Sequence, residues 1–370
     1  MAPLRELIEY LESWAPPSWA MEYDNVGLQL GDPDQGVHRV LVALDLTEEV
    51  VAEAEAWSAD LILTHHPPLF HPLRRCTSQE PLGRMLMRLV RSGRAVYSAH
   101  TNLDVAPGGV NDALAARLGL QNVRVLDPLP NMLRKLVVFV PVTHVDLLRR
   151  AMADAGAGRI GAYEECAFEV RGTGLFRPLQ EARPHLGEVG RLGRVEEVRL
   201  EMQVPAWRLG AVLQALRAAH PYEEPVWDVY PLEKPVAEAG MGRIGELPHP
   251  MPADAFLAYV VERLHVQALR YGVGPQERIH RVAVCGGSGS SLWTVAARQG
   301  ADALITADVR YHTFQEASAA LWLLDAGHYE TEVPVLEVLA ERLRRAFPKL
   351  ACRVARAENP VLYISRERVG

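Results

Sequence analysis

The sequence predicts an α/β protein: a discontinuous two-halved α/β domain with a pseudo-repeat, plus an inserted ferredoxin-like α+β domain. Three observations predict this. Both ends of the chain alternate short, continuously apolar, β-rich runs with helical patterns, as buried parallel strands in βαβ units do. The middle of the chain repeats a strand and helix passage between Gly-rich turns. A weak internal repeat relates the two ends. The length of 370 residues agrees with two or three units.

The first third begins with an amphipathic helix and continues with three strand and helix pairs. Strands are expected within 38–47, 59–66 and 95–104, and helices within 48–57, 83–93 and 110–119. The last third repeats this alternation of strands and helices, with strands expected within 280–287, 301–309 and 321–332. Its helices are expected within 290–300 and 333–347, with a short helical stretch between the last two strands.

The middle contains two similar passages, at 134–156 and 198–220, each a strand followed by a helix. This order suggests a ferredoxin-like split unit. Its edges are marked by Pro128 and Pro130, and by Pro231, Pro235 and the Gly-rich stretch 240–245, as linkers often are. We therefore expect a domain over 131–235 inserted into a host domain over 1–130 and 236–370.

The internal repeat indicates where a site would form. ADLILTHH aligns with ADALITAD, which places His66 against Asp308. AHTNLD and GHYETE each contain a His followed four residues later by a carboxylate. If the two halves share one sheet, these groups meet in one crevice at the carboxyl ends of the strands.

His65 and His66 end an apolar strand and precede Pro67 and Pro68, which stop the strand. Adjacent side chains of a strand point to opposite faces, so the two histidines are expected to serve different ions. For an isolated His-His pair, a solvated strand end with one histidine in a core hydrogen bond is the better interpretation. Two further His and carboxylate pairs, in a chain with 13 histidines, favour metal binding instead.

Imidazole with carboxylate suits zinc, manganese, iron or cobalt and not calcium. The expected cofactor is two divalent ions per chain, among which zinc, manganese, iron, cobalt and magnesium are not distinguished. Glu332 is the best candidate for a bridging carboxylate, with Asp104 terminal on one ion. Further candidates orient a ligand or are satisfied polar groups at strand ends, namely His100, Asp308 and His312.

The stretch 286–291 lies between a strand and a helix, where free N–H groups favour an anion, so Gly287 and Ser288 are substrate or phosphate candidates. It lacks a P-loop lysine, and taken alone a tight turn is the commoner interpretation. Asp24, Asn25 and Gly27 are read as a turn before a strand.

Composition excludes several classes. The net charge of −7 comes without a basic run, so nucleic acid is not favoured. The cluster of Arg342, Arg344 and Arg345 is interpreted as a solvated helix face. Four cysteines without CxxC spacing fit a reducing compartment. No charged-then-apolar leader and no apolar run of membrane length is present, so a cytoplasmic protein without a membrane span is expected.

At these residues the sequence resembles the Nif-three-like dinuclear metal proteins, a family often labelled GTP cyclohydrolase I type two. The matching motifs lie in both ends of the chain: YDNVGLQLGD, LTHHPPLF, SAHTNLDVAPGGVND, CGGSGSS, ITADVRYH and DAGHYETE. The resemblance implies that His65 and His328 bind one ion and that His66 and Asp104 bind the other, with Glu332 bridging. Ala307 stands where members commonly have Gly, and no loss of metal is expected from it.

The middle segment resembles the insert that some members carry, similar to PII and CutA-like signalling domains, with HPYEEPVWDVYPL as the matching stretch. The resemblance also implies a homohexamer. Two functions are weighed. One is a metal-dependent hydrolase of a nucleotide, phosphoester or C–N bond, in which metal-bound water replaces a separate catalytic base. The other is a metal-stabilised hexameric scaffold or regulatory protein with a small-molecule-sensing insert. A purely structural metal site is the third reading.

Overall fold

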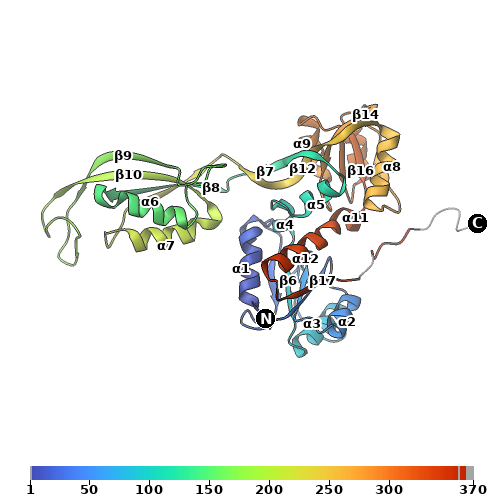
Figure 1. The fold of residues 1–370 in the computed structure, drawn as a ribbon, viewed down its shortest axis with the longest axis horizontal. Helices are drawn as coiled ribbons and strands as arrows, with labels where there is room; N and C mark the ends of the chain where they lie inside the picture. Colours follow the sequence, from blue (N-terminus) through green and yellow to red (C-terminus); the bar gives the residue numbers. More distant parts are fainter. Residues whose placement is uncertain (1, 357–358, 364–370) are drawn as a thin grey trace, which may run out of the picture. The chain divides into compact units, whose positions relative to one another are not determined.

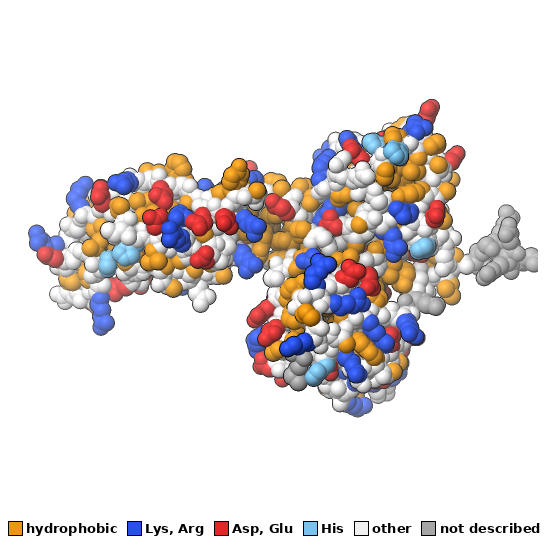
Figure 2. Space-filling model, in the orientation of Figure 1, with side chains coloured by type: hydrophobic (Ala, Val, Ile, Leu, Met, Phe, Trp, Pro, Cys, Tyr) orange, Lys and Arg blue, Asp and Glu red, His pale blue; other side chains and the backbone are white. Residues whose placement is uncertain are grey.

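The computed structural model describes residues 2–356 and 359–363. The chain forms two compact units, one made of residues 1–128 with 237–370 and the other of residues 129–236. Within the described residues, none of the helices combines the length and apolar character needed to cross a bilayer. On the face that Figure 2 shows, basic and acidic side chains are interspersed in both units.

The first unit contains a five-stranded sheet in the order β17-β4-β5-β6-β2. Its strands are parallel except for β2, which runs antiparallel to β6. Helices α2 (Glu48–Ala56) and α3 (Pro81–Arg91) cover one face with a core that includes Val50, Ile62 and Leu89. The strand bounds are β2 Gly27–Leu30, β4 Arg39–Ala43, β5 Leu61–Thr64, β6 Ala95–Ser98 and β17 Ala351–Val354.

A six-stranded sheet in the same unit has the order β13-β16-β15-β14-β12-β7. Its central strands β14, β15 and β16 are parallel, β12 runs antiparallel to β14, and β13 runs antiparallel to β16. Helices α5 (Val110–Arg117) and α8 (Ala253–Leu264) pack on one face, and α9 (Trp293–Arg298) and α10 (Tyr311–Ala317) on the other. The strand bounds are β7 Gln121–Leu129, β12 Val236–Pro252, β13 Arg270–Gly272, β14 Arg278–Val284, β15 Ala303–Thr306 and β16 Trp322–Asp325.

The expectation that the two halves share one sheet is wrong. The pseudo-repeat forms two separate sheets because other strands occupy the edges at which the halves would join. In the first sheet β2 and β17 flank the central strands, and in the second β13 lies on one side with β12 and β7 on the other. No free edge of β4 to β6 is left for β14 to β16 to extend.

A further helix of this unit links its two sheets. Helix α12 (Pro334–Ala346) follows the second sheet along the chain but packs against β4 and β17 of the first sheet and against α5. Figure 1 shows it, in red, beside the blue N-terminal helix α1 (Leu4–Trp14). Two short helices follow strand ends, α4 (Thr101–Val105) and α11 (His328–Glu332). A small two-stranded sheet pairs β1 (Ala2–Pro3) with β3 (Gly36–Val37).

The second unit has the order strand, helix, strand, strand, helix, strand, which is that of a ferredoxin-like split unit. Its antiparallel sheet has the order β11-β8-β10-β9, and both helices lie on one face of it (Figure 1). The core beneath the helices includes Leu148, Leu200 and Leu216. The bounds are β8 Leu133–Pro141, α6 Val145–Asp154, β9 Ala167–Phe176, β10 Gly193–Pro205, α7 Leu209–Ala219 and β11 Trp227–Leu232.

Asn111 is a buried connection between α5 and the loop after β14. Its Nδ2 donates to the carbonyl of Asp104 at 2.8 Å, and its Oδ1 accepts from the N–H of Gly286 at 2.9 Å. Asn111→Ala leaves both backbone groups buried without these partners. We expect the free energy of unfolding to fall by about 2 to 4 kcal/mol, measured by urea denaturation. Ser13→Ala, which removes a solvent-exposed hydrogen bond to Tyr10, is the control. Equal small losses in both variants would contradict this role.

Candidate metal centre

Three polar segments begin where buried parallel strands end. His65 and His66 follow β5, His100 and Asp104 follow β6, and α11 follows β16 of the second sheet. Backbone bonds from the N–H of His65 to Ala43 and from that of His66 to Leu44 extend the pairing of β5 with β4 by two residues. The carboxyl ends of strands from both sheets therefore supply one cluster.

His65 is completely buried and has a fixed orientation. Its Nδ1 donates to the carbonyl of Ala99 at 2.8 Å. In the neutral ring Nε2 therefore carries the lone pair, and this atom faces two acids, at 3.5 Å from Oδ1 of Asp104 and 3.8 Å from Oε1 of Glu332.

His66 and His328 are held in the same way by carboxylates. Nδ1 of His66 lies 2.8 Å from Oδ1 of Asp45, and Nδ1 of His328 lies 2.6 Å from Oδ2 of Asp308. Their Nε2 atoms lie 3.4 Å apart. Metal-binding histidines commonly use the second ring nitrogen in this way, which fixes the tautomer and the ring orientation.

Glu332 lies between the two groups. Its Oε2 is 3.0 Å from Nε2 of His66 and 3.2 Å from Nε2 of His328, while its Oε1 faces His65. The backbone makes room for it at Gly287, where φ is +61° and a Cβ would collide with Oε1 of Glu332. Glycine at this position is therefore required twice, by the backbone angle and by the close approach of the acid.

His100 lies against both histidines of the first half. Its ring centroid is 5.2 Å from that of His65 and 5.4 Å from that of His66, and one ligand atom of each of these three rings lies within 4.8 Å of the others. Nδ1 of His100 lies 2.9 Å from Oδ1 of Asp24, whose other oxygen accepts from the N–H and hydroxyl of Thr101. His100 thus has the same carboxylate-held geometry as His66.

The other candidates occupy different positions. Asp308 orients His328, and Ser288 donates its hydroxyl to Asp308. In the Gly-rich loop the N–H groups of Gly286, Gly287 and Gly289 donate to side chains of the protein itself, so those donors are not free for an anion. His312 is exposed, and its described ring contact is with Tyr311.

The distances group the ligands differently from the pairing that the resemblance implied. His65 lies with Asp104 and Oε1 of Glu332, whereas His66 lies with His328 and Oε2 of Glu332. The pairing of His65 with His328 and of His66 with Asp104 on the two ions stays a prediction, and the side chains themselves are grouped differently. The physical reason is the alternation that separates His65 from His66, since it turns His65 toward α4 and His66 toward α11.

The residues fit divalent metal ions. Nε2 of His65 and Oδ1 of Asp104 are buried side-chain atoms without a hydrogen-bond partner. Buried polar atoms are nearly always paired, so two such atoms that face each other beside the carboxylate of Glu332 point to a binding place for a cation. Imidazole nitrogen with carboxylate oxygen is the ligand set of zinc, manganese, iron and cobalt.

The charges of the cluster are strongly coupled. Burial lowers the pKa of His66, but hydrogen bonds with Asp45 and Glu332 outweigh burial and raise this pKa to about 10. The pKa of His328 rises to about 9, where burial is outweighed by Glu332 and Asp308. Burial raises the pKa of Asp104 to about 6 although His65 opposes it. Burial also acts to raise the pKa of Glu332, but the neighbouring histidines hold it well below its usual value.

Two acids of this site escaped the sequence analysis. Asp45 was not singled out, although it follows β4 as the histidines follow β5, and that shared position at the carboxyl end of a parallel strand is the signal that would have found it. Asp24 was read only as a turn residue. Its partner His100 is distant in sequence, and no local pattern connects them.

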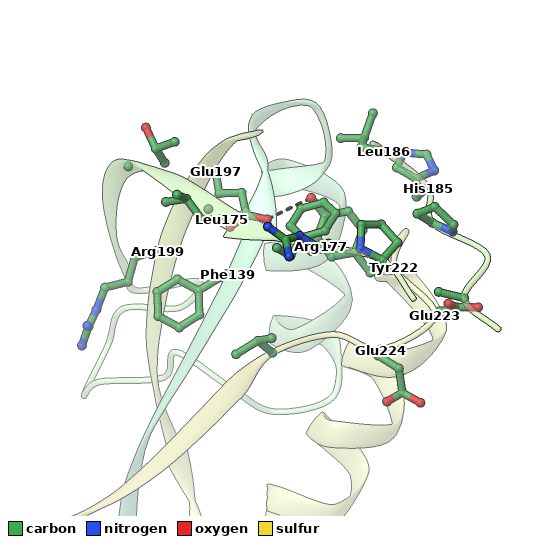
Figure 3. Close-up of a pocket in the computed structure, with 18 of the residues that line it drawn as sticks. Phe139, Leu175, Arg177, His185, Leu186, Glu197, Arg199, Tyr222, Glu223 and Glu224 are labelled. Atoms are coloured by element: carbon green, nitrogen blue, oxygen red, sulfur yellow. Dashed lines mark hydrogen bonds between the residues drawn. The ribbon is translucent and has the colours of Figure 1, made fainter. Parts of the chain in front are cut away.

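A hollow in the second unit is a separate candidate binding site (Figure 3). Its volume is about 870 Å³ and its walls are mainly apolar, with Phe139, Phe176 and Val226 among them. The carboxylate of Glu197, a buried residue, accepts a hydrogen bond from the hydroxyl of Tyr222 at 2.9 Å. A Cβ at Gly174 would collide with this carboxylate. Volume and lining are those of small-molecule sites.

The fold and the site define a discontinuous α/β protein with a cluster of histidines and carboxylates supplied by two sheets. The family model Duf34/NIF3 (NGG1p interacting factor 3) matches residues 2–360, and the chain belongs to this family.

Relatives and solved structures agree with this assignment. The chain is similar to a "GTP cyclohydrolase 1 type 2 homolog" of Bacillus subtilis, with 41% identity over 89% of each chain. It is similar to one of Mycobacterium tuberculosis, with 42% identity over 93% of this chain and 92% of the relative. The structure of a Bacillus cereus protein related to NIF3 has a TM-score of 0.82 and 39% identity, and the match covers 98% of this chain and 99% of that one.

Metal binding is expected to release protons. The pKa values of His66 and His328, about 10 and about 9, mean that both rings are protonated imidazolium cations at pH 7 in the metal-free protein. An ion must displace these protons, so its apparent affinity rises with pH, by about tenfold per pH unit for each proton released. Calorimetric titration with zinc at pH 7 in buffers of different ionisation enthalpy counts the protons. Binding without proton release would contradict the geometry.

Proposed function

We propose that this protein is a metal-dependent hydrolase with a dinuclear centre, acting on a nucleotide, a phosphoester or a C–N bond. The observation that carries the proposal is the convergence of imidazole Nε2 atoms and carboxylate oxygens, with Nδ1 of each histidine bound to an oxygen acceptor. The names of the similar proteins, GTP cyclohydrolase 1 type 2 homologs, support a nucleotide among these substrates.

In this proposal His65, Asp104 and one oxygen of Glu332 would hold one ion, and His66, His328 and the other oxygen the second. Bound ions supply Lewis-acid activation of water and of the susceptible bond. The protein positions the ligands through Ala99, Asp45 and Asp308. His65, Asp104 and Glu332 are buried, so the inner side of the cluster is shielded from water. His100 is a candidate additional ligand or a substrate contact.

We expect His66→Ala and Glu332→Ala to lose bound metal and to lower turnover by at least about a hundredfold. Each removes one ligand, and Glu332→Ala removes the group that faces both halves. Elemental analysis measures metal, and release of product from a panel of nucleotides and phosphoesters measures turnover. His249→Ala, an exposed histidine on β12, is the matched control and should retain both.

The results of these experiments distinguish a hydrolase from a structural metal site. Metal retained with no turnover over the whole panel would overturn the hydrolase and leave a structural metal site. Turnover that survives Glu332→Ala with stoichiometric metal would overturn the ligand assignment.

A second candidate is a metal-stabilised hexameric scaffold or regulatory protein whose insert senses a small molecule. The observation that favours it is the hollow beside Glu197 and Tyr222. Here we propose that residues 131–235 form a PII or CutA-like domain inserted into a host domain of residues 1–130 and 236–370, and that the chain forms a cytoplasmic homohexamer. Light scattering of the purified protein tests the hexamer.

Variants of the insert distinguish the two candidates. In the regulatory case, Phe139→Ala and Glu197→Ala should abolish a ligand-induced change in activity or assembly and leave metal content unchanged. Leu147→Ala, an exposed residue on α6 outside the hollow, is the control. If a cell-extract metabolite pool shifts the melting temperature of the natural protein and both hollow variants equally, the hollow is not a sensor site.

A further inference from the structure

A row of aromatic rings leads from the surface of the first unit to the metal centre. The ring centroid of Tyr23 lies 6.2 Å from that of Phe70, and Phe70 lies 6.2 Å from His100. His100 is in turn 5.4 Å from His66. The interplanar angles are 60°, 76° and 81°, so neighbouring rings meet edge to face.

The segment YDN builds this row. Asn25 donates from Nδ2 to the carbonyl of Leu69 at 2.7 Å, which fixes the loop after His66 next to residues 23–25. Asp24 binds His100 and Thr101. Two loops far apart in sequence are therefore joined at the position where Tyr23 and Phe70 meet.

The two outer rings are not core residues. Tyr23 is 68% exposed, and Phe70 is only partly buried. Burial raises the pKa of Tyr23, and the charges of Asp24 and Asp104 add to this effect, which agrees with a phenol close to these two carboxylates. Exposed aromatic rings beside a polar cluster offer flat faces on which a planar ligand can stack.

We infer that Tyr23 and Phe70 bind the nucleobase of a nucleotide substrate whose reacting group lies at the metal centre. The inference rests on the proposed function, because it places the ring of that substrate. Two parts of the site would bind two parts of the nucleotide. The aromatic faces suit its planar base, and ions held by His65, His66 and the acids suit its anionic group. Every base has a flat face that can stack on an aromatic side chain, so these two rings require a planar ring and do not by themselves determine which base binds.

The test compares ligands with and without a base on the metal-loaded, full-length protein. Affinities of the four nucleoside 5′-monophosphates and of ribose 5-phosphate are measured by calorimetry. At least one nucleotide should bind more tightly than ribose 5-phosphate. Tyr23→Ala and Phe70→Ala should each lower the affinity for that nucleotide by about tenfold. The affinity for ribose 5-phosphate and the metal content should stay unchanged.

Further variants separate stacking from general loss of structure. Phe70→Leu keeps the apolar volume but should behave like Phe70→Ala, whereas Tyr23→Phe should retain the affinity. Asn25→Ala should lower the affinity for the nucleotide because it removes the hydrogen bond to the Leu69 carbonyl, which fixes the loop next to residues 23–25. Tyr311→Ala, which removes an exposed tyrosine outside the row, is the matched control.

Three results would overturn the inference: all four nucleotides binding no tighter than ribose 5-phosphate, equal weakening of both ligand types in the variants, or full affinity in Phe70→Leu. These results are independent of turnover. Base-dependent binding without hydrolysis would refute the proposed hydrolase and keep the ring site. Hydrolysis with an unchanged KM in Tyr23→Ala and Phe70→Ala would keep the hydrolase and refute the ring site.

Discussion

The centre depends on one recurring constraint, the commitment of Nδ1 of each histidine to an oxygen acceptor. A carbonyl holds His65, and carboxylates hold His66, His100 and His328. A neutral imidazole has one donor and one acceptor nitrogen, so once the rings have lost their Nε2 protons this choice leaves the Nε2 lone pairs of His65, His66 and His328 free to bind a cation beside the shared acids. The acceptors therefore determine the orientation of the imidazole rings and of their Nε2 atoms. These acceptors come from the ends of four different strands and loops.

The same constraint explains why two sheets are needed. Parallel strands present polar groups at one end, and a single sheet would have set the two pseudo-equivalent halves side by side in one row. With separate sheets, His66 and His328 instead meet from opposite sides, with Nε2 atoms 3.4 Å apart. Glu332 fills the space between them because the loop at Gly287 has no side chain there. Helix α12 belongs to the second half by sequence and to the first sheet by packing, so it connects the two sheets.

Local sequence patterns predict much of this architecture. Continuous apolar runs such as LILT predicted buried parallel strands, and β5 is buried at all four positions. The His and carboxylate four residues apart in GHYETE were predicted to contribute to one site, and the structure brings the side chains of His328 and Glu332 together on helix α11.

Tertiary geometry was less accessible. The edges of a sheet are decided by pairings such as β17 with β4, which join residues far apart in sequence, and no periodicity reports them. The partners Asp24 and Asp45 were missed for the same reason, since an acid at a strand end looks the same in sequence whether or not an imidazole reaches it.

The pairing of β17 with β4 also has a consequence for biosynthesis. Ala351 lies opposite Arg39, so one neighbour of β4 leaves the ribosome only after all the other described strands of the two sheets. Until then the backbone amides and carbonyls on that side of β4 have no permanent partner, and an open strand edge of this kind invites association with other nascent chains. Chaperone dependence should therefore be concentrated in the interval between the appearance of the first sheet and the arrival of its last strand.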